Sequence, residues 1–350
     1  MKIAIAVGGA ASGKDRNFER VVQFAVEAEK LGADMAWSAE AWGMDAVAPL
    51  AFLAARTNRL RLGTGIMQIS ARVPAMTAMT ALTMASISGD RFLLGLGASG
   101  PQVVEGLHGR PFKAPATRMR ETIEIVRKAF RGEKLEYHGL HHELPLPGGE
   151  GKALRLSQAP NPDIPIYLAT LAPRGLELTG ELADGWLGTS FIPEHADAHL
   201  SYIRKGAEKA GRSLDDIDIG VGGNVHFGDD VEAMVESRRP YLAFTLGAMG
   251  SPRTNFYNTA FRRAGFEEAC IEVQRLWVDG RREEAAKRVP EEMILRTNLL
   301  GTESMVRQRI RAYRDAGVDT LRIDPSGDDL SDRLDTLGRA IELVRQECPA

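Results

Sequence analysis

The chain has 350 residues, 44% hydrophobic and 26% charged, so it can bury a large core. A net charge of −3 argues against nucleic acid as a partner. The two cysteines, Cys270 and Cys348, support neither a disulfide framework nor a cysteine metal site. No apolar run approaches the ~20 residues that span a bilayer. We therefore expect a cytoplasmic protein with no membrane partner and no metal.

Short apolar segments alternate with longer amphipathic segments in the first part of the chain. The pattern predicts strands at residues 3–7, 34–38, 60–66 and 91–96, and helices at 17–31, 45–57, 74–87 and 115–130. A segment rich in proline, glycine and histidine follows and predicts an irregular hairpin near 134–160. Its three histidines, which we expect to be surface residues, are His138, His141 and His142.

The alternation resumes after this segment. It predicts strands at residues 164–169, 185–189, 217–225 and 318–323, and helices at 173–182, 194–210 and 331–346. Residues 229–315 are mostly helical, which is longer than one crossover needs. Eight strands with helical crossovers predict a parallel sheet closed into a (β/α)8 TIM barrel, with an open doubly wound sheet as the alternative. We expect one domain over 1–350, with the irregular insertion near 134–160 and a helical insertion near 240–300.

Two glycine-rich segments follow predicted strands. Residues 8–14 match the phosphate-loop spacing, but Asp15 stands where a Ser or Thr would hold Mg²⁺. We therefore interpret this segment as a loop over the barrel mouth. Residues 95–100 match G-x-G-x-x-G after the fourth strand, which alone is weak evidence for a dinucleotide fold. Small residues there still let backbone N–H groups approach an anion, although a plain tight turn is the alternative.

Other candidate residues also follow predicted strands. Glu40 and Trp42 come after the second strand, and His226 ends the seventh. The segments after strands five and six contain Pro173, which suits a helix start, and Thr189. In a barrel these positions meet at the C-terminal face, where active sites lie. Ordinary turn chemistry is the alternative for each of them.

Five motifs in this order resemble the luciferase-like monooxygenase superfamily, particularly its branch that uses the deazaflavin coenzyme F420 and includes methylenetetrahydromethanopterin reductase-like proteins. They are residues 37–42 (WSAEAW), 62–68 (LGTGIMQ), 74–78 (PAMTA), 91–97 (RFLLGLG) and 182–186 (LADGW). The resemblance implies a barrel, usually dimeric, with the cofactor ring at the C-terminal mouth. It also implies a non-prolyl cis peptide behind the ring, and the matching bond is Gly65–Ile66.

The resemblance assigns the cofactor contacts residue by residue. Phosphate contacts would fall on two segments, Gly97, Ala98, Ser99 and Gly100, and Ala169, Thr170, Leu171 and Ala172. Ring and pocket contacts would fall on Thr64, Gly65, Ile66, Met67 and Thr189. An arginine, Arg72 or Arg174, would help to hold the acidic tail of F420.

The departures from the family bear on the substrate. Relatives that oxidise a sugar phosphate carry a histidine, a glutamate and a lysine where this chain has Ala41, Gly100 and Ile192. Sugar-phosphate oxidation is therefore disfavoured. With Ala41 and Met67 near the ring, we expect a small neutral or hydrophobic substrate.

The resemblance predicts an F420-dependent oxidoreductase that transfers a hydride between deazaflavin and a small molecule. A reduced-FMN monooxygenase and a non-catalytic cofactor-binding barrel are the alternatives. Glu40, Trp42 and His226 are the candidate catalytic residues. Glu40 would either donate a proton or only accept a hydrogen bond, Trp42 would shape the pocket, and His226 is a second candidate proton donor.

Overall fold

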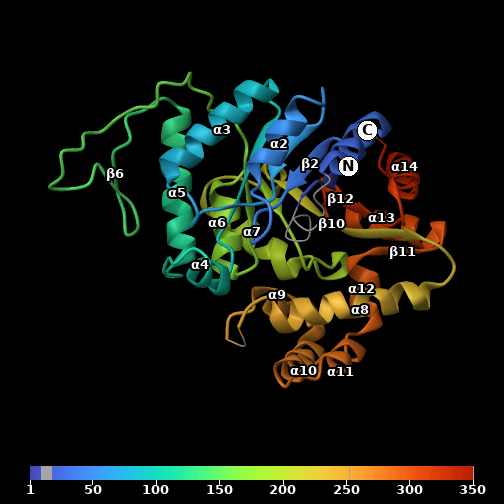
Figure 1. The fold of residues 1–350 in the computed structure, drawn as a ribbon. Helices are drawn as coiled ribbons and strands as arrows, with labels where there is room; N and C mark the ends of the chain where they lie inside the picture. The colour runs from blue at the N-terminus through green and yellow to red at the C-terminus, as the bar shows by residue number, and fades with distance from the viewer. Residues whose placement is uncertain (9–17, 252, 350) are drawn as a thin grey trace.

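The computed structural model describes residues 1–8, 18–251 and 253–349. Within them, eight parallel strands close into a barrel (Figure 1), because β12 pairs with both β1 and β10. The strands in order are β1 (Lys2–Ala6), β2 (Met35–Ser38), β3 (Arg61–Thr64), β5 (Phe92–Gly97), β8 (Ile166–Ala169), β9 (Gly185–Leu187), β10 (Asp218–Phe227) and β12 (Thr320–Pro325). The predicted (β/α)8 barrel is confirmed, and the open sheet is excluded.

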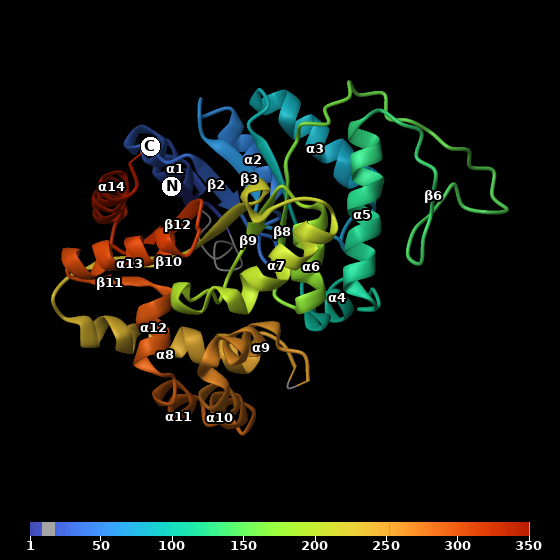
Figure 2. The same ribbon diagram turned by 180° about the vertical axis from the view of Figure 1, so that it is seen from behind.

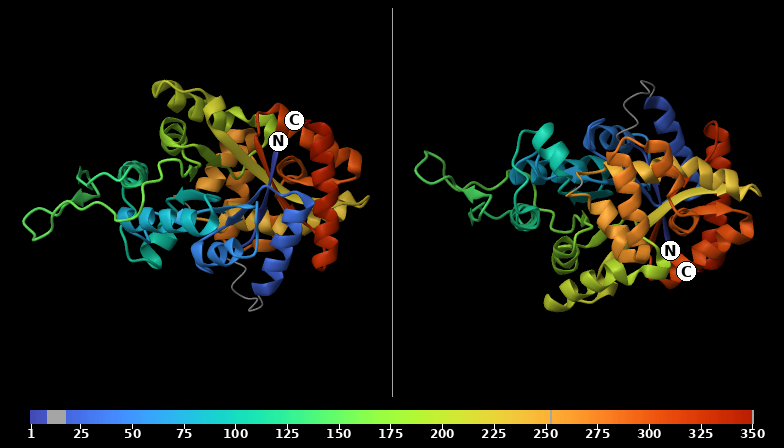
Figure 3. Two further views of the ribbon diagram at one scale, coloured as in Figure 1. Left: turned by 90° about the horizontal axis from the view of Figure 1, so that it is seen from above. Right: turned by 90° about the horizontal axis from the view of Figure 1, so that it is seen from below.

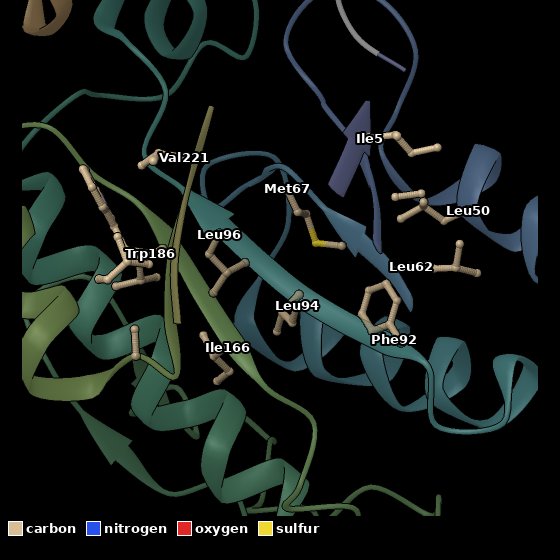
Figure 4. Packing of buried hydrophobic residues seen from close by; sticks show 14 of the residues in the cluster. Ile5, Leu50, Leu62, Met67, Phe92, Leu94, Leu96, Ile166, Trp186 and Val221 are labelled. Atoms are coloured by element: carbon tan, nitrogen blue, oxygen red, sulfur yellow. The ribbon is translucent and has the colours of Figure 1, made fainter. Parts of the chain in front are cut away.

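Helices surround the strands, as two opposite views show (Figure 3). They are α1 (Phe18–Leu31), α2 (Val47–Ala54), α3 (Pro74–Ser88), α5 (Pro115–Phe130), α6 (Pro173–Leu182), α7 (Asp197–Lys209), α13 (Glu303–Asp315) and α14 (Leu330–Glu347). Proline begins α3, α5 and α6, where its missing N–H has no helical partner to lose. The main core lies between strands and helices, and Figure 4 shows part of it, including Ile5, Leu62 and Phe92.

Several short elements were not predicted. The strand expected at residues 60–66 ends at Thr64, and the chain resumes pairing as β4 (Met67–Gln68) against β5. A short helix, α4 (Pro101–Gly106), follows β5, and β11 (Leu299–Gly301) pairs with β10. A 3₁₀ turn at Pro193–His195 precedes α7, which therefore begins later than predicted. Beyond Gly8, the segment that matches the phosphate-loop spacing lies outside the described residues.

The predicted irregular hairpin is an arm that projects from the barrel beside α5 (Figures 1 and 2). It contains β6 (Tyr137–His138) paired with β7 (Glu143–Leu144). The Glu121 carboxylate on α5 accepts three backbone N–H groups of the arm, from residues 140–142, at 2.7 to 3.0 Å. His138 is exposed as expected, but His141 and His142 are half-buried, because this anchor draws their backbone against α5.

The helical insertion begins earlier than predicted, because α8 (Val231–Ala248) is continuous from residue 231. It continues as α9 (Phe256–Phe261), α10 (Glu267–Val278), α11 (Arg282–Lys287) and α12 (Glu291–Thr297). These helices enclose a second core, which contains Leu246, Phe261 and Met293. Among the helices described, none is long and apolar enough to cross a membrane.

Candidate functional site

A cavity of about 170 Å³ lies inside the barrel. It is lined by residues from six strands, from the segments that follow β3, β8 and β9, and from helix α9: Ala4, Trp37, Gly65, Ile66, Ala169, Thr170, Leu171, Leu187, Thr189, Gly220, Tyr257, Thr320 and Arg322. Two larger hollows, of about 430 and 480 Å³, are open depressions beside the chain termini and beside α7. We assign the site to the barrel cavity because it is more enclosed and contains strand-end residues.

Two aromatic rings form a packed layer within the barrel. Trp37 and Tyr167 meet edge to face, with ring centroids 5.2 Å apart. Gly63 on the neighbouring strand leaves the space that the indole occupies, since a Cβ at that position would overlap the ring. Trp37 therefore presents a rigid apolar wall to the cavity.

The chain forms a bulge between β3 and β4, where the Gly65–Ile66 peptide bond is cis, as predicted. The Thr64 hydroxyl donates to the Gly95 carbonyl oxygen at 2.8 Å and accepts from the Gly95 N–H at 2.9 Å, which ties β3 to β5. On the far side, Ile66 packs against Gly97, where an added Cβ would come within 2.6 Å of the isoleucine side chain. The bulge thus presents Ile66 to the cavity from a fixed backbone.

Glu40 acts as a junction behind this bulge. Its Oε1 accepts the Gln68 N–H at 3.0 Å and a guanidinium N–H of Arg72 at 2.7 Å. Its Oε2 accepts the Ala46 N–H at 3.3 Å, and its own N–H donates to the Ile66 carbonyl oxygen at 3.1 Å. The carboxylate is therefore fully engaged in holding the segment after β2 against β4, which favours the hydrogen-bond acceptor role over proton donation.

Fixed side chains hold the loop after β8. The Trp186 indole N–H donates to the Thr170 carbonyl oxygen at 3.0 Å, and the Arg263 guanidinium donates to the Leu171 carbonyl oxygen at 2.6 Å. Ala172 then occupies the N-cap position of α6. Two carbonyl groups of the loop thus point toward supporting side chains rather than toward the cavity.

The loop after β5 lies at the same edge of the barrel. Gly97 pairs with Ala169 of β8 and with Gln68 of β4. Ser99 adopts a left-handed conformation with φ of 59°, and Gly100 caps α4. The fold therefore brings the two predicted phosphate-binding segments, 97–100 and 169–172, side by side.

The model of the family described as luciferase-like monooxygenase matches residues 1–320 of the chain. The chain belongs to the luciferase-like family. It is 38% identical over 326 residues to a provisionally named coenzyme F420-dependent oxidoreductase of Mycobacterium tuberculosis, covering 91% of this chain and 93% of the relative. It is 28% identical to 5,10-methylenetetrahydromethanopterin reductase of Archaeoglobus fulgidus, with 93% and 96% covered.

Solved structures agree with this family. The coenzyme F420-dependent tetrahydromethanopterin reductase of Methanopyrus kandleri superposes with a TM-score of 0.77 and 26% identity, covering 99% of this chain and 97% of that one. The structural likeness therefore covers the insertions as well as the barrel strands.

Some of the predicted site residues line the barrel cavity, and others lie outside it. Gly65, Ile66, Ala169, Thr170, Leu171 and Thr189 line it. Thr64 and Met67 are fully buried, and the Met67 side chain packs in the core between barrel and helices. The expectation of a neutral substrate depended on Met67 and Ala41, and neither lines the cavity.

The predicted catalytic residues also lie away from the cavity lining. Trp42 was expected to shape the pocket, but it is 54% exposed and does not line the cavity. His226 is half-buried near the end of β10, beyond Gly220. Arg72, expected to hold a cofactor tail, instead pairs with Glu40.

Sequence reasoning missed three polar residues of the cavity, Thr320 and Arg322 on β12 and Tyr257 on α9. Leu321 and Ile323 are buried in the core, so strand alternation turns Arg322 toward the barrel interior. The arginine between the buried apolar residues Leu321 and Ile323 was the sequence feature that could have indicated this site residue. No sequence feature indicated Tyr257, because it lies in the helical insertion, where strand alternation cannot predict which residues face the barrel.

Two asparagines position Tyr257. The amide of Asn255 donates to the Thr245 and Leu246 carbonyl oxygens, at 3.1 and 2.9 Å. The amide of Asn258 donates to the carbonyl oxygens of Leu246 and Cys270, at 3.1 and 2.8 Å. Both amides are buried, so α9 is fixed to α8 and α10 with Tyr257 directed at the barrel.

No group of side chains suited to holding a metal ion occurs in the described part of the chain.

Proposed function

We propose that this protein is a coenzyme F420-dependent oxidoreductase that acts on a small organic molecule. The observation that carries the proposal is the 38% identity, over nearly the whole chain, with a relative named for this coenzyme. The barrel cavity supports it, because the cavity lies against the Gly65–Ile66 bulge that the family uses to back its cofactor ring.

The residues present fit a planar ring with a phosphate tail. Ile66, Leu171 and Leu187 offer apolar contacts on the cavity wall. The Ile66 side chain packs directly against Gly97, where a Cβ would overlap it. At one edge of the cavity, the adjacent segments 97–100 and 169–172 supply backbone N–H groups for a phosphate. We propose that these segments hold the phosphate and that Gly65 and Ile66 support the ring.

A bound deazaflavin supplies a hydride donor or acceptor, which the protein chain lacks. The chain contributes orientation and exclusion of water, since Trp37 on β2 and Ile66 in the bulge after β3 bound the cavity. Burial raises the pKa of the Tyr257 hydroxyl, so this group keeps its proton at neutral pH and acts as a hydrogen-bond donor at the cavity wall.

We further propose that the whole chain forms one domain and works as a cytoplasmic homodimer. Support for a dimer comes from apolar side chains exposed on two neighbouring helices, α2 and α3: Phe52, Met76 and Met79. Both cysteines are free, which is consistent with a reducing compartment.

Titration of the purified protein with F420 and, separately, with FMN tests the proposed function. Calorimetry or fluorescence should show F420 binding at least about tenfold more tightly, which is ~1.4 kcal/mol. Tighter binding of FMN, or oxygen consumption with reduced FMN, would instead support a monooxygenase of the same fold.

A further inference from the structure

The cavity contains a positive charge that the rest of the described chain does not neutralise. Arg322 lies on β12 and lines the cavity. Among the residues that the structure describes, none forms a hydrogen bond or salt bridge with its guanidinium. The carboxylate two residues along, Asp324, is exposed and accepts a hydrogen bond from the Asn224 amide at 2.5 Å. Within the described residues, the donors of Arg322 thus remain available.

Other hydrogen-bond donors line the same cavity. The hydroxyls of Tyr257 and Thr189 both belong to residues of its lining. Tyr257 and Arg322 line the same cavity, and the Arg322 charge lowers the pKa of Tyr257 against the larger, raising effect of burial. The nearby Thr320 hydroxyl differs, because it donates to Asp218 at 2.7 Å.

A guanidinium in a partly enclosed space favours an anionic partner. It presents five N–H donors in a planar fork and stays charged at every physiological pH, and leaving such a group unpaired away from water is unfavourable. A carboxylate matches this fork with two parallel hydrogen bonds. The lining also includes apolar side chains, among them Ile66, Leu171 and Leu187, which suits a small organic acid better than a hydrated inorganic ion.

We propose that Arg322, together with the hydroxyls of Tyr257 and Thr189, binds a carboxylate group of the substrate. The proposal rests on the proposed function and names the substrate class within it. It replaces the expectation of a neutral substrate, which depended on residues outside the cavity lining.

The anionic partner has two candidate sources, the substrate and an anionic oxygen of the cofactor ring. The order of strands favours the substrate. Four steps around the barrel separate β12 from β5 in either direction, so Arg322 stands opposite the proposed phosphate segment 97–100. The ring-backing bulge at Gly65–Ile66 adjoins β5, which leaves the β12 side of the cavity for the second reactant.

The test compares benzoate with benzamide, which have the same shape but differ in charge. Their dissociation constants are measured by calorimetry for wild type, Arg322→Gln and Arg322→Lys, with F420 affinity measured separately. Wild type should bind benzoate at least about tenfold more tightly than benzamide. Arg322→Gln should abolish this preference, Arg322→Lys should keep part of it, and F420 affinity should change less than about threefold.

Equal binding of the two probes by wild type would overturn the proposal, as would a preference that survives in Arg322→Gln. A large loss of F420 affinity in Arg322→Gln without loss of benzoate preference would assign the anion to the cofactor. If circular dichroism shows that Arg322→Gln does not fold, the comparison of benzoate with benzamide in wild type still tests the proposal. Tyr257→Phe adds a second test, because it should weaken the binding of benzoate but not that of benzamide. If wild type prefers benzoate but does not bind F420, the proposed function fails, whereas the carboxylate site at Arg322 is retained.

Discussion

Arg72 donates to the Glu40 carboxylate at 2.7 Å, and both side chains are largely shielded from water, with 21% and 9% exposed. The pair lies directly behind the Gly65–Ile66 bulge, because Glu40 also binds the backbone of Gln68. The Glu40 carboxylate, which the sequence presented as a candidate proton donor, therefore supports the cavity wall through these hydrogen bonds.

Glu40→Gln should act on stability and cofactor binding rather than on proton transfer. The amide keeps the shape but leaves Arg72 without a counter-charge, which costs about 1–3 kcal/mol of unfolding free energy. Urea unfolding measures this loss, and combining Glu40→Gln with Arg72→Gln should recover part of it. If Glu40 were the proton donor, turnover would instead drop ~10²–10⁴-fold with F420 affinity preserved.

Gly97→Ala should lower F420 affinity about tenfold, because the added Cβ would come within 2.6 Å of Ile66 and push that side chain toward the cavity. Gly106→Ala provides the matched control, since a Cβ there meets nothing within 4 Å. Fluorescence titration compares the two variants. An equal effect on both would show that Ile66 does not support the ring.

Gly100→Asp should lower F420 affinity at least about tenfold, because its carboxylate would stand against the proposed phosphate site. Gly100→Asn has nearly the same shape without the charge and should bind within about threefold of wild type. Added Cβ atoms at this position have space, so the fold should tolerate both changes. Identical titration curves for the two variants would place the phosphate elsewhere.

Met76→Glu combined with Met79→Glu should convert the proposed homodimer to a monomer, because two charges would be buried in an apolar interface on α3. Sedimentation velocity measures the change. Ile271→Glu on α10, also at an exposed apolar position, should leave the dimer intact. A wild type that sediments as a monomer would contradict the proposal.

His199→Phe should reduce the sensitivity of the fold to acid. Burial beside Trp186 and Phe191 lowers the pKa of His199 to about 3 from an ordinary 6.5. Between these values the unfolded chain holds more protons, so stability is lost as pH falls through this window.

The difference in unfolding free energy between His199→Phe and wild type should therefore grow by about 1.4 kcal/mol for each pH unit below 6.5. Urea unfolding at pH 8 and at pH 5 measures it. Parallel pH profiles for the two proteins would show that His199 is not held neutral in the folded state.

Local patterns were enough to predict the barrel. Alternating strands and helices, and prolines at 74, 115 and 173, predicted helix starts that the structure confirms at the same residues. These features depend on neighbours a few residues apart along the chain, which the sequence shows directly. The family resemblance carried in part by the motif at residues 62–68 implied the cis bond at Gly65–Ile66, which the structure confirms.

The polar lining of the cavity depended on contacts between distant parts of the chain. Tyr257 reaches the barrel only because Asn255 and Asn258 fix α9 to helices on either side of it in sequence. Trp42, close to a strand end in sequence, points to solvent instead. Sequence position predicts which edge of a barrel a residue occupies, and strand alternation indicates that Arg322 faces the interior. Packing between elements decides which helix residues reach that interior, and so Tyr257 emerged only from the tertiary structure.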